Sequence, residues 1–260
     1  MKRKNLPLVS IILPTYENWR GLERAVNSVL NQTYKNFEVL IIDDASSRET
    51  RGRIDMIANS DARCTLHNLL VNSGPGAARR LGQEKARGEY VAFLDTDDAW
   101  LPEKLEVQIN AMEDNRWDIS HTSYAKCAPE TEVISETVEK RRTVVAKDIV
   151  SYDDLLASNW IGCSTAIYRK SAFPDHFMGN MRTRQDYAFW LELLKNGTVS
   201  HGIMQALTLY SVSPKGLSAN KLHAAAAHYQ VLKNYTELSA PKRMWAFIRY
   251  AMRGAVKFRI

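Results

Sequence analysis

The first half of the chain alternates short apolar runs with segments whose apolar residues recur at helical spacing. Runs rich in β-branched residues are typical of buried strands, whereas apolar residues three and four positions apart form one face of a helix. These patterns predict strands over residues 8–13, 37–42, 65–71 and 90–94, and helices over residues 19–32, 48–58, 74–87 and 102–115. Because short connections join strand to helix to strand, we expect an α/β fold with a mostly parallel central sheet flanked by helices.

The second half of the chain is less regular. It predicts strands over residues 119–124, 164–168 and 203–210, and helices over residues 185–194, 222–238 and 243–258. Residues 130–147 are polar and weakly patterned, and residues 211–220 are predicted to form a polar loop. The last two helices would form a C-terminal helical extension.

Polar residues follow three of the predicted strands at the point where each strand ends. They are Pro14-Thr15-Tyr16-Glu17, Asp43-Asp44 and Asp95-Thr96-Asp97. In open α/β sheets, ligands bind outside the carboxyl ends of the strands. We therefore expect the three clusters to line one crevice.

Asp95 and Asp97 are two positions apart at the end of a predicted buried strand. Both carboxylates can then reach one hard cation, which prefers oxygen ligands. Mg²⁺ or Mn²⁺ held in this way also binds a diphosphate. The alternative is a solvated acidic loop, or an N-terminal cap for the helix over residues 102–115. The position directly after a buried strand favours the metal.

Three further groups are candidates for binding or catalysis, and each has a structural alternative. Asp44 is placed to accept a hydrogen bond from a base or ribose, or to cap the following helix. The segment from Asn72 to Gly76 opens a helix at a point that favours anions, with Arg79 one turn further on; a solvated arginine is the simpler interpretation. Asp186 is either a general base or a cap near the start of the helix over residues 185–194, and its spacing alone favours the cap.

Composition narrows the choice of partner. The net charge of +6 favours anionic partners such as nucleotides, phosphates or an acidic membrane surface. Nucleic-acid binding would rest on charge alone and is not predicted. The three cysteines are far apart and have no metal-ligand spacing, which fits a reducing cytoplasm. No run approaches the roughly 20 apolar residues that span a bilayer.

Several blocks of the sequence, in the same order, resemble glycosyltransferase family 2, whose members have the GT-A fold. The blocks are residues 9–16, 28–34, 38–46 and 86–98, with thinner ones at 184–187 and 209–221. The resemblance implies inverting, metal-dependent transfer from a nucleotide-sugar, usually a UDP-sugar, as in bacterial surface polysaccharide, lipopolysaccharide or O-antigen assembly. It also implies a catalytic domain over residues 1–215, with a nucleotide-sugar half over 1–115 and an acceptor half over 116–215, followed by the extension over 216–260.

The resemblance implies roles for individual residues as well. Asp97 would ligate Mn²⁺ or Mg²⁺, and Asp95 would contact the ribose or the metal shell. Asp186 would be the catalytic base, against the cap that its spacing favours. The remaining donor-site residues would be Pro14, Thr15, Tyr16, Glu17 and Asp44 around the nucleoside, with Asn72, Gly76, Arg79 and Thr96 beside them.

Departures from the family pattern bear on activity. Gln185 precedes the base where many relatives have Glu, Arg80 stands where many have Asn, and Ser211 and Ser213 replace the Arg and His that often steady the diphosphate. One alternative is therefore a nucleotide-sugar-binding module that has lost catalysis. Another is a sugar-nucleotide nucleotidyltransferase, but the first strand lacks its Gly-rich loop. The QxxRW block of processive synthases is absent, which indicates that one sugar is added per encounter.

The last 20 residues are basic and contain no acid. In a helix, one face would carry Lys242, Arg249, Arg253 and Lys257, with Arg243 beside them, and the opposite face would carry Met244, Phe247, Ile248, Ala251, Ala255 and Phe258. This pattern is typical of a helix in an anionic membrane surface, or of one packed on the catalytic domain with a solvated cationic face. Membrane contact would suit a saccharide or undecaprenyl-diphosphate-linked acceptor, and a cytoplasmic enzyme peripheral on the inner face of the cell membrane.

Overall fold

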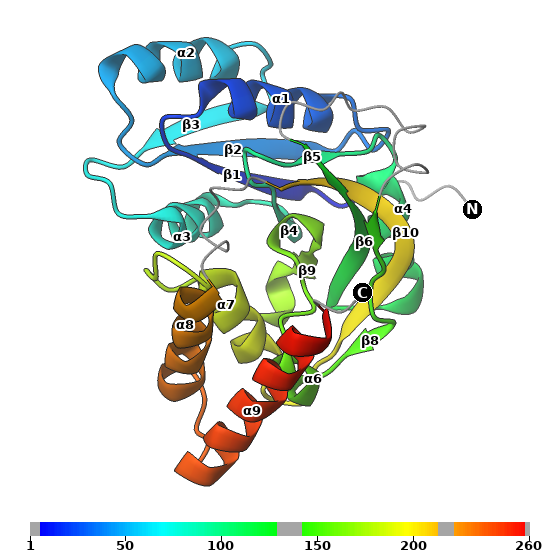
Figure 1. Cartoon of the computed structure of the whole chain (residues 1–260). Coiled ribbons are helices and arrows are strands. Elements are labelled where there is room, and N and C mark those ends of the chain that lie inside the picture. Colours follow the sequence, from blue (N-terminus) through cyan, green and yellow to red (C-terminus); the bar gives the residue numbers. More distant parts are fainter. Residues whose placement is uncertain (1–5, 129–141, 213–220, 258–260) are drawn as a thin grey trace.

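The computed structural model describes residues 6–128, 142–212 and 221–257. In these residues, strands join into one sheet with the order β3-β2-β1-β4-β9-β6-β10-β5, and β7 and β8 pair with β6 and β10. Helices cover both faces of its first part (Figure 1). The α/β fold class expected from the sequence is confirmed.

The first half of the chain follows its hydrophobic pattern closely. Its elements are β1 (Val9–Thr15), α1 (Trp19–Leu30), β2 (Phe37–Asp43), α2 (Arg48–Ala58), β3 (Cys64–Asn68), α3 (Pro75–Lys85), β4 (Tyr90–Phe93), β5 (Ala99–Trp100) and α4 (Lys104–Asn115). The third strand ends before Leu70 and Val71, which are exposed. Strands β3, β2, β1 and β4 are all parallel.

Alternation along β1 explains why helices lie on both sides of the sheet. Ile11 and Leu13 belong to the apolar cluster formed with α1, α2 and α4. Ile12, between them, belongs to the opposite cluster with residues of α3 and α7. Successive side chains of a strand point to opposite faces, so a strand that is apolar at every position requires two cores. Figure 1 shows α1 and α2 on one face of β1–β3 and α3 on the other.

The second half of the chain makes the sheet mixed rather than parallel throughout. Its elements are β6 (Ile119–Cys127), β7 (Thr143–Val144), β8 (Ile149–Val150), α6 (Tyr152–Ala157), β9 (Ile167–Arg169), α7 (Gln185–Leu194) and β10 (Ser200–Ser211). Strand β9 is antiparallel to both β4 and β6. The strand expected over residues 164–168 starts later, because a 3₁₀ turn occupies Cys163–Thr165. Most of the polar stretch 130–147 lies outside the described residues.

The C-terminal helices α8 (Lys221–Asn234) and α9 (Ala240–Lys257) pack against the body of the protein. Val231, Leu232 and Ala246 are buried in the same apolar cluster as α7. The sequence left membrane contact and packing open for this segment, and one face of α9 does pack. None of the helices in the described part of the chain has both the length and the apolar content to span a bilayer.

Only part of the apolar face that the sequence predicts for α9 packs on the core. Phe247 packs against the core cluster, whereas Met244 and Ile248 are exposed, together with Trp245 and Met252. The small side chain of Ala246 instead lets the helix approach the core. The sequence also placed Arg253, Lys257, Ala255 and Phe258 on the two faces of this helix. Their side chains lie outside those that the structure describes.

Candidate active site

One large cavity, of about 1140 Å³, lies at the carboxyl ends of β1 and β4. Ten of the twelve residues that the sequence predicted for the site line it: Pro14, Thr15, Tyr16, Asp44, Asn72, Arg79, Asp95, Thr96, Asp97 and Asp186. Asp186 comes from α7, far along the chain from the others. The polar strand ends therefore do meet in a single crevice.

Glu17 does not line this cavity. Its carboxylate accepts hydrogen bonds from Ser47 N at 2.5 Å and from Thr50 Oγ1 at 2.6 Å. These two hydrogen bonds, led by the one from Thr50, lower the pKa of Glu17. The side chain thus holds the first turn of α2 to the end of β1. A direct contact of Glu17 with the nucleoside stays a prediction.

Gly76 lies behind the cavity wall. A Cβ atom at this position would lie 2.3 Å from the carbonyl oxygen of Gly179 and 2.7 Å from that of Met181. Glycine therefore allows α3 to touch the segment that leads into α7. Gly76 is therefore a packing position next to the cavity and not one of the residues that line it.

We expect Gly76→Ala to lower the free energy of unfolding by about 1–3 kcal/mol, because backbone atoms must shift to admit the methyl group. Gly52→Ala is the matched control. It lies inside α2, where an added Cβ would meet nothing within 4 Å, so it is expected to raise stability by about 0.5–1 kcal/mol. Urea unfolding measures both. An unchanged free energy of unfolding in Gly76→Ala would contradict the close approach of α3 to the backbone at Gly179 and Met181.

Asp44 and Thr15 line the cavity with different kinds of oxygen atoms. Each Asp44 oxygen accepts a backbone N–H, one from Ser73 and one from Gly74, both at 2.7 Å. Asp44 therefore fixes the turn that opens α3. Thr15 Oγ1 is buried and has no hydrogen-bond partner among the described residues, which leaves it available to a ligand.

The acidic cluster after β4 places three carboxylates together. One oxygen each of Asp95, Asp97 and Asp98 lies within 4.8 Å of the others. Desolvation, followed by the charge of Asp95, raises the pKa of Asp97. Desolvation and the charges of Asp97 and Asp95 raise the pKa of Asp98 well above its ordinary value. Carboxylates that repel one another in this way are stabilised by a bound cation.

The three carboxylates are not equally available to a cation. Asp98 is buried and accepts hydrogen bonds from Ser164 Oγ at 2.6 Å and Ser211 N at 2.9 Å. Asp95 pairs with Arg79. Asp97 is the exposed member of the cluster. Hard oxygen ligands around one exposed carboxylate fit Mg²⁺ or Mn²⁺, which keep several ligand positions for water and phosphate.

Arg79 supplies positive charge in the middle of the cavity. Its side chain is buried, and its Nη1 and Nε atoms have no partner among the described residues. Burial acts to lower the pKa of Arg79, but Asp95 and other acids nearby outweigh it and raise the pKa. The guanidinium stays charged and retains donors for an anionic ligand.

Asp186 lies in the first turn of α7 and faces the same cavity. It is not the N-cap: that position is Arg184, and α7 has no side-chain cap. The Asp186 carboxylate accepts a hydrogen bond from Asn159 Nδ2 at 3.3 Å. Burial raises its pKa, while Arg79 acts in the opposite direction. The cap that spacing alone favoured is therefore wrong, whereas the role of Asp186 as a base stays a prediction.

Comparisons with known proteins agree with this geometry. Residues 10–177 match the family model for glycosyl transferase family 2. The chain is 36% identical over 254 residues to TuaG of Bacillus subtilis strain 168, a protein named as a teichuronic acid biosynthesis glycosyltransferase, and the match covers 98% of each chain. The chain belongs to glycosyltransferase family 2. It is an enzyme of the glycosyltransferase class.

A second relative of this family 2 glycosyltransferase carries a more specific name. The chain is 31% identical to WfgD of Escherichia coli, named UDP-Glc:alpha-D-GlcNAc-diphosphoundecaprenol beta-1,3-glucosyltransferase, over 96% of this chain and 94% of WfgD. The family model ends before Asp186, whereas both relatives match across α7 and the C-terminal helices.

Solved structures support the fold of the family 2 glycosyltransferase. S. aureus TarS 1–349 in complex with UDP-GlcNAc superposes with a TM-score of 0.69 at 18% identity, over 94% of this chain and 71% of that one. A mannosyltransferase from Pyrobaculum calidifontis with GDP-Man and Mn²⁺ gives 0.68 at 16% identity, over 97% and 75%. The GT-A fold expected from the sequence is confirmed.

Sequence reasoning missed several residues of the cavity. They include Asn159, Trp160, Ser164, Arg184 and Tyr210. Asp98 was visible as the third acid of its run, and its full burial distinguishes it from the other two. Ser164 and Tyr210 lie at the ends of predicted strands, whereas Asn159, Trp160 and Arg184 lie outside every predicted element. Only the fold brings these residues beside the ends of β1 and β4.

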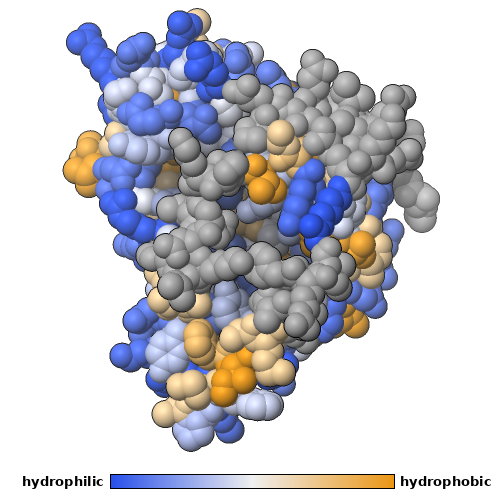
Figure 2. Space-filling view, viewed as in Figure 1, coloured by the Kyte–Doolittle hydropathy of each residue, from blue (hydrophilic) through white to orange (hydrophobic). Residues whose placement is uncertain are grey.

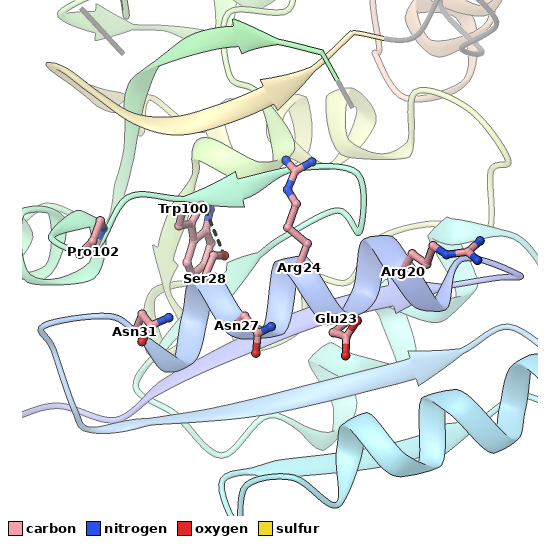
Figure 3. Close-up of a pocket in the computed structure, with 8 residues that line it drawn as sticks. All are labelled: Arg20, Glu23, Arg24, Asn27, Ser28, Asn31, Trp100 and Pro102. Carbon is pink, nitrogen blue, oxygen red and sulfur yellow. Dashed lines mark hydrogen bonds between the residues drawn. The ribbon is translucent and has the colours of Figure 1, made fainter. Parts of the chain in front are cut away.

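A second hollow, of about 630 Å³, lies along the outer side of α1 (Figure 3). It is lined by Arg20, Glu23, Arg24, Asn27, Ser28, Asn31, Trp100 and Pro102. The side chain of Arg24 extends from this hollow to the acidic cluster. Its Nη2 donates hydrogen bonds to Asp97 O at 3.3 Å and to Ser211 Oγ at 3.4 Å. Arg24 therefore connects this hollow to the candidate metal loop.

Proposed function

We propose that this protein moves one sugar from a UDP-sugar to a lipid-diphosphate-linked saccharide, with inversion at the anomeric carbon and with a divalent metal at Asp97. One observation carries the proposal: Asp186 and the Asp95–Asp97 pair line the same cavity. An inverting transferase needs a base on the acceptor side and a cationic site at the departing diphosphate.

The donor end of the cavity suits a nucleoside diphosphate. Thr15 Oγ1 and Arg79 Nη1 are buried polar atoms without partners among the described residues, and such atoms are expected to gain partners from a ligand. Arg79 would donate to a phosphate oxygen while its Nη2 stays with Asp95. Mg²⁺ or Mn²⁺ at Asp97, with Asp95 beside it, would supply charge neutralisation for the diphosphate as it departs.

The acceptor end supplies the base. Asp186 would take the proton of the acceptor hydroxyl as that oxygen attacks the anomeric carbon, on the side opposite the departing diphosphate. Asn159 orients the carboxylate through its hydrogen bond. Trp160 and Tyr210 line the same cavity and would hold a sugar ring against their apolar faces.

The relatives favour the donor and acceptor classes. WfgD is named for UDP-glucose and a GlcNAc-diphosphoundecaprenol acceptor, and TarS is described with UDP-GlcNAc. We infer a role in bacterial surface polysaccharide assembly for this chain as well, with O-antigen or a teichuronic-acid-like polymer as the product class. The decisive experiment is metal-dependent binding of UDP-, GDP- and dTDP-sugars, followed by transfer to a sugar-diphosphate-lipid acceptor.

The competing assignments predict different reactions. A binding module without catalysis would bind a nucleotide-sugar and transfer nothing. A nucleotidyltransferase would release pyrophosphate from a nucleoside triphosphate and a sugar phosphate. We expect transfer with release of UDP, and neither of the other results.

An exposed apolar strip on α9 supports peripheral contact with an anionic membrane. It consists of Met244, Trp245, Ile248 and Met252, which are between 41% and 63% exposed. The helix carries basic residues and no acid over Ala240–Lys257, a combination that favours the surface of anionic lipids. Figure 2 shows apolar side chains gathered at the end of the molecule formed by α8 and α9.

We expect the double variant Trp245→Glu/Ile248→Glu to lose binding to phosphatidylglycerol vesicles by about tenfold or more, because two apolar side chains no longer enter the lipid. Vesicle flotation measures this. Met56→Glu is the control, since Met56 is equally exposed, on α2. Equal flotation of all three proteins, or equal binding to phosphatidylcholine, would rule out this surface.

A further inference from the structure

Three rings stack between the C-terminal helices and the helix of Asp186. The His228 ring lies between Tyr250, at 3.7 Å between centroids and 10° between planes, and Tyr187, at 4.8 Å and 16°. His228 and Tyr187 are both fully buried. The rings come from α9, α8 and α7 in that order, so the stack links the end of the chain to the active-site helix.

Tyr187 connects this stack to the site, because it follows Asp186 directly in the first turn of α7. Its hydroxyl donates to Leu155 O at 2.8 Å. The ring is therefore fixed at its tip by α6 and across its face by His228. A displacement of Tyr187 would move the Cα atom of the neighbouring Asp186.

Arg184, on the other side of Asp186, is also tied to α9. It has a left-handed backbone conformation, with φ of 60°, which is unfavourable for a residue other than glycine and persists only where the surroundings enforce it. Its Nη2 donates to Tyr250 Oη at 3.3 Å. Tyr250 thus contacts the residues that flank the base on both sides, one directly and one through His228.

The stack is an uncharged one. Burial, together with the nearby positive charge of Arg184, lowers the pKa of His228 to about 3. The imidazole is therefore neutral at physiological pH and packs as a flat aromatic ring. Neighbouring Ala227 lines the cavity itself, so α8 forms part of the site wall.

We propose that Tyr250 and His228 are positioning residues for Asp186, so that the C-terminal helix pair sets the geometry of the base. The inference rests on the proposed role of Asp186. A displacement of about 1 Å at a reacting group can cost about a hundredfold in rate. The rings provide this control without touching the substrate.

The experiment compares substitutions within α8 and α9 in the full-length protein. Tyr250→Leu keeps an apolar side chain but removes the ring and the hydroxyl, and Tyr250→Phe restores the ring alone. Tyr229→Leu is the matched control, because Tyr229 packs on Phe247 between α8 and α9, with ring centroids at 5.4 Å. Tyr229 reaches Tyr250 only through Phe247, whose ring lies 6.3 Å from that of Tyr250. The measurements are kcat, the KM for the UDP-sugar, UDP affinity and thermal unfolding.

We expect Tyr250→Leu to lower kcat by about 10–100-fold, with the KM for the UDP-sugar and UDP affinity within about twofold. Tyr250→Phe should recover most of this rate. Tyr229→Leu should lower the unfolding temperature to a similar extent and leave kcat unchanged. If Tyr250→Leu retains kcat, or if Tyr229→Leu loses as much, the positioning role is wrong.

Asp186→Asn in the same series separates this inference from the proposed function. If Asp186→Asn transfers sugar as fast as the wild type, Asp186 is not the base and the proposed mechanism fails. If Asp186→Asn is inactive and Tyr250→Leu is fully active, the mechanism stands and the positioning role alone is overturned.

Discussion

Replacement of Asp186 by Asn is expected to lower kcat for sugar transfer by about 10³-fold, because general base catalysis contributes between about 10² and 10⁴. The amide retains the shape and the hydrogen bond to Asn159 but cannot take a proton. Metal-dependent UDP binding should stay within about twofold, since the donor end of the cavity is unchanged. Stopped assays with a labelled UDP-sugar measure kcat, and calorimetry measures the affinity for UDP.

Glu192→Gln is the control for this substitution. It changes an exposed acid of the same helix α7 and should leave the rate unchanged. Burial raises the pKa of Asp186 above its ordinary value, and only the deprotonated form accepts a proton. Transfer should therefore fall as the pH decreases, at a pH above the usual range of an aspartate. Full activity of Asp186→Asn would remove the basis of the mechanism.

Asp97→Asn is expected to have the second largest effect, a loss of about 10²-fold or more in metal affinity and in transfer at saturating UDP-sugar. Asp97 is the exposed acid of the cluster, and removing a charged oxygen ligand weakens a hard cation's site directly. Titration calorimetry with Mn²⁺ in the presence of UDP measures the affinity. A chelator should abolish wild-type transfer, and added Mn²⁺ or Mg²⁺ should restore it.

Asp55→Asn is the matched control for the metal site, since Asp55 is an exposed acid on α2 far from the cluster in sequence. It should change neither the metal affinity nor the rate. Sugar transfer that proceeds equally well in chelator, or an Asp97→Asn enzyme with wild-type Mn²⁺ affinity, would show that the acidic cluster has a structural role only.

The first half of the chain was largely predictable because its signals are local. A strand buried on both faces must be apolar at nearly every position, as β1 and β2 are, and a parallel sheet gathers its strand ends at one edge. The meeting of Thr15, Asp44 and Asp97 in one cavity could therefore be predicted. Glu17 was harder to interpret, because a residue beside a strand end can turn outward to hold the next helix.

The second half of the chain was less predictable because its part of the cavity wall includes irregular segments. Asn159, Trp160 and Arg184 are separated from the strand ends by long stretches of chain, and no periodic pattern marks them. The assignment of Asp186 shows the limit clearly: its spacing indicated a cap, whereas the structure has Arg184 at that position. The contact of Asp186 with the cavity depends on how α7 packs, which no local pattern encodes.

The sequence by itself determined the alternation of strands and helices, the acidic cluster after β4 and the basic character of the C-terminal segment, because periodicity and charge are properties of neighbouring residues. Only the tertiary structure decided that Asp186 faces the cavity of Asp97, that Asp98 is buried, and that α9 turns Ala246 rather than Met244 toward the core. Each of these depends on which surfaces meet. A helix with apolar residues on more than one side can pack by either, and the shape of the neighbouring helices makes the choice.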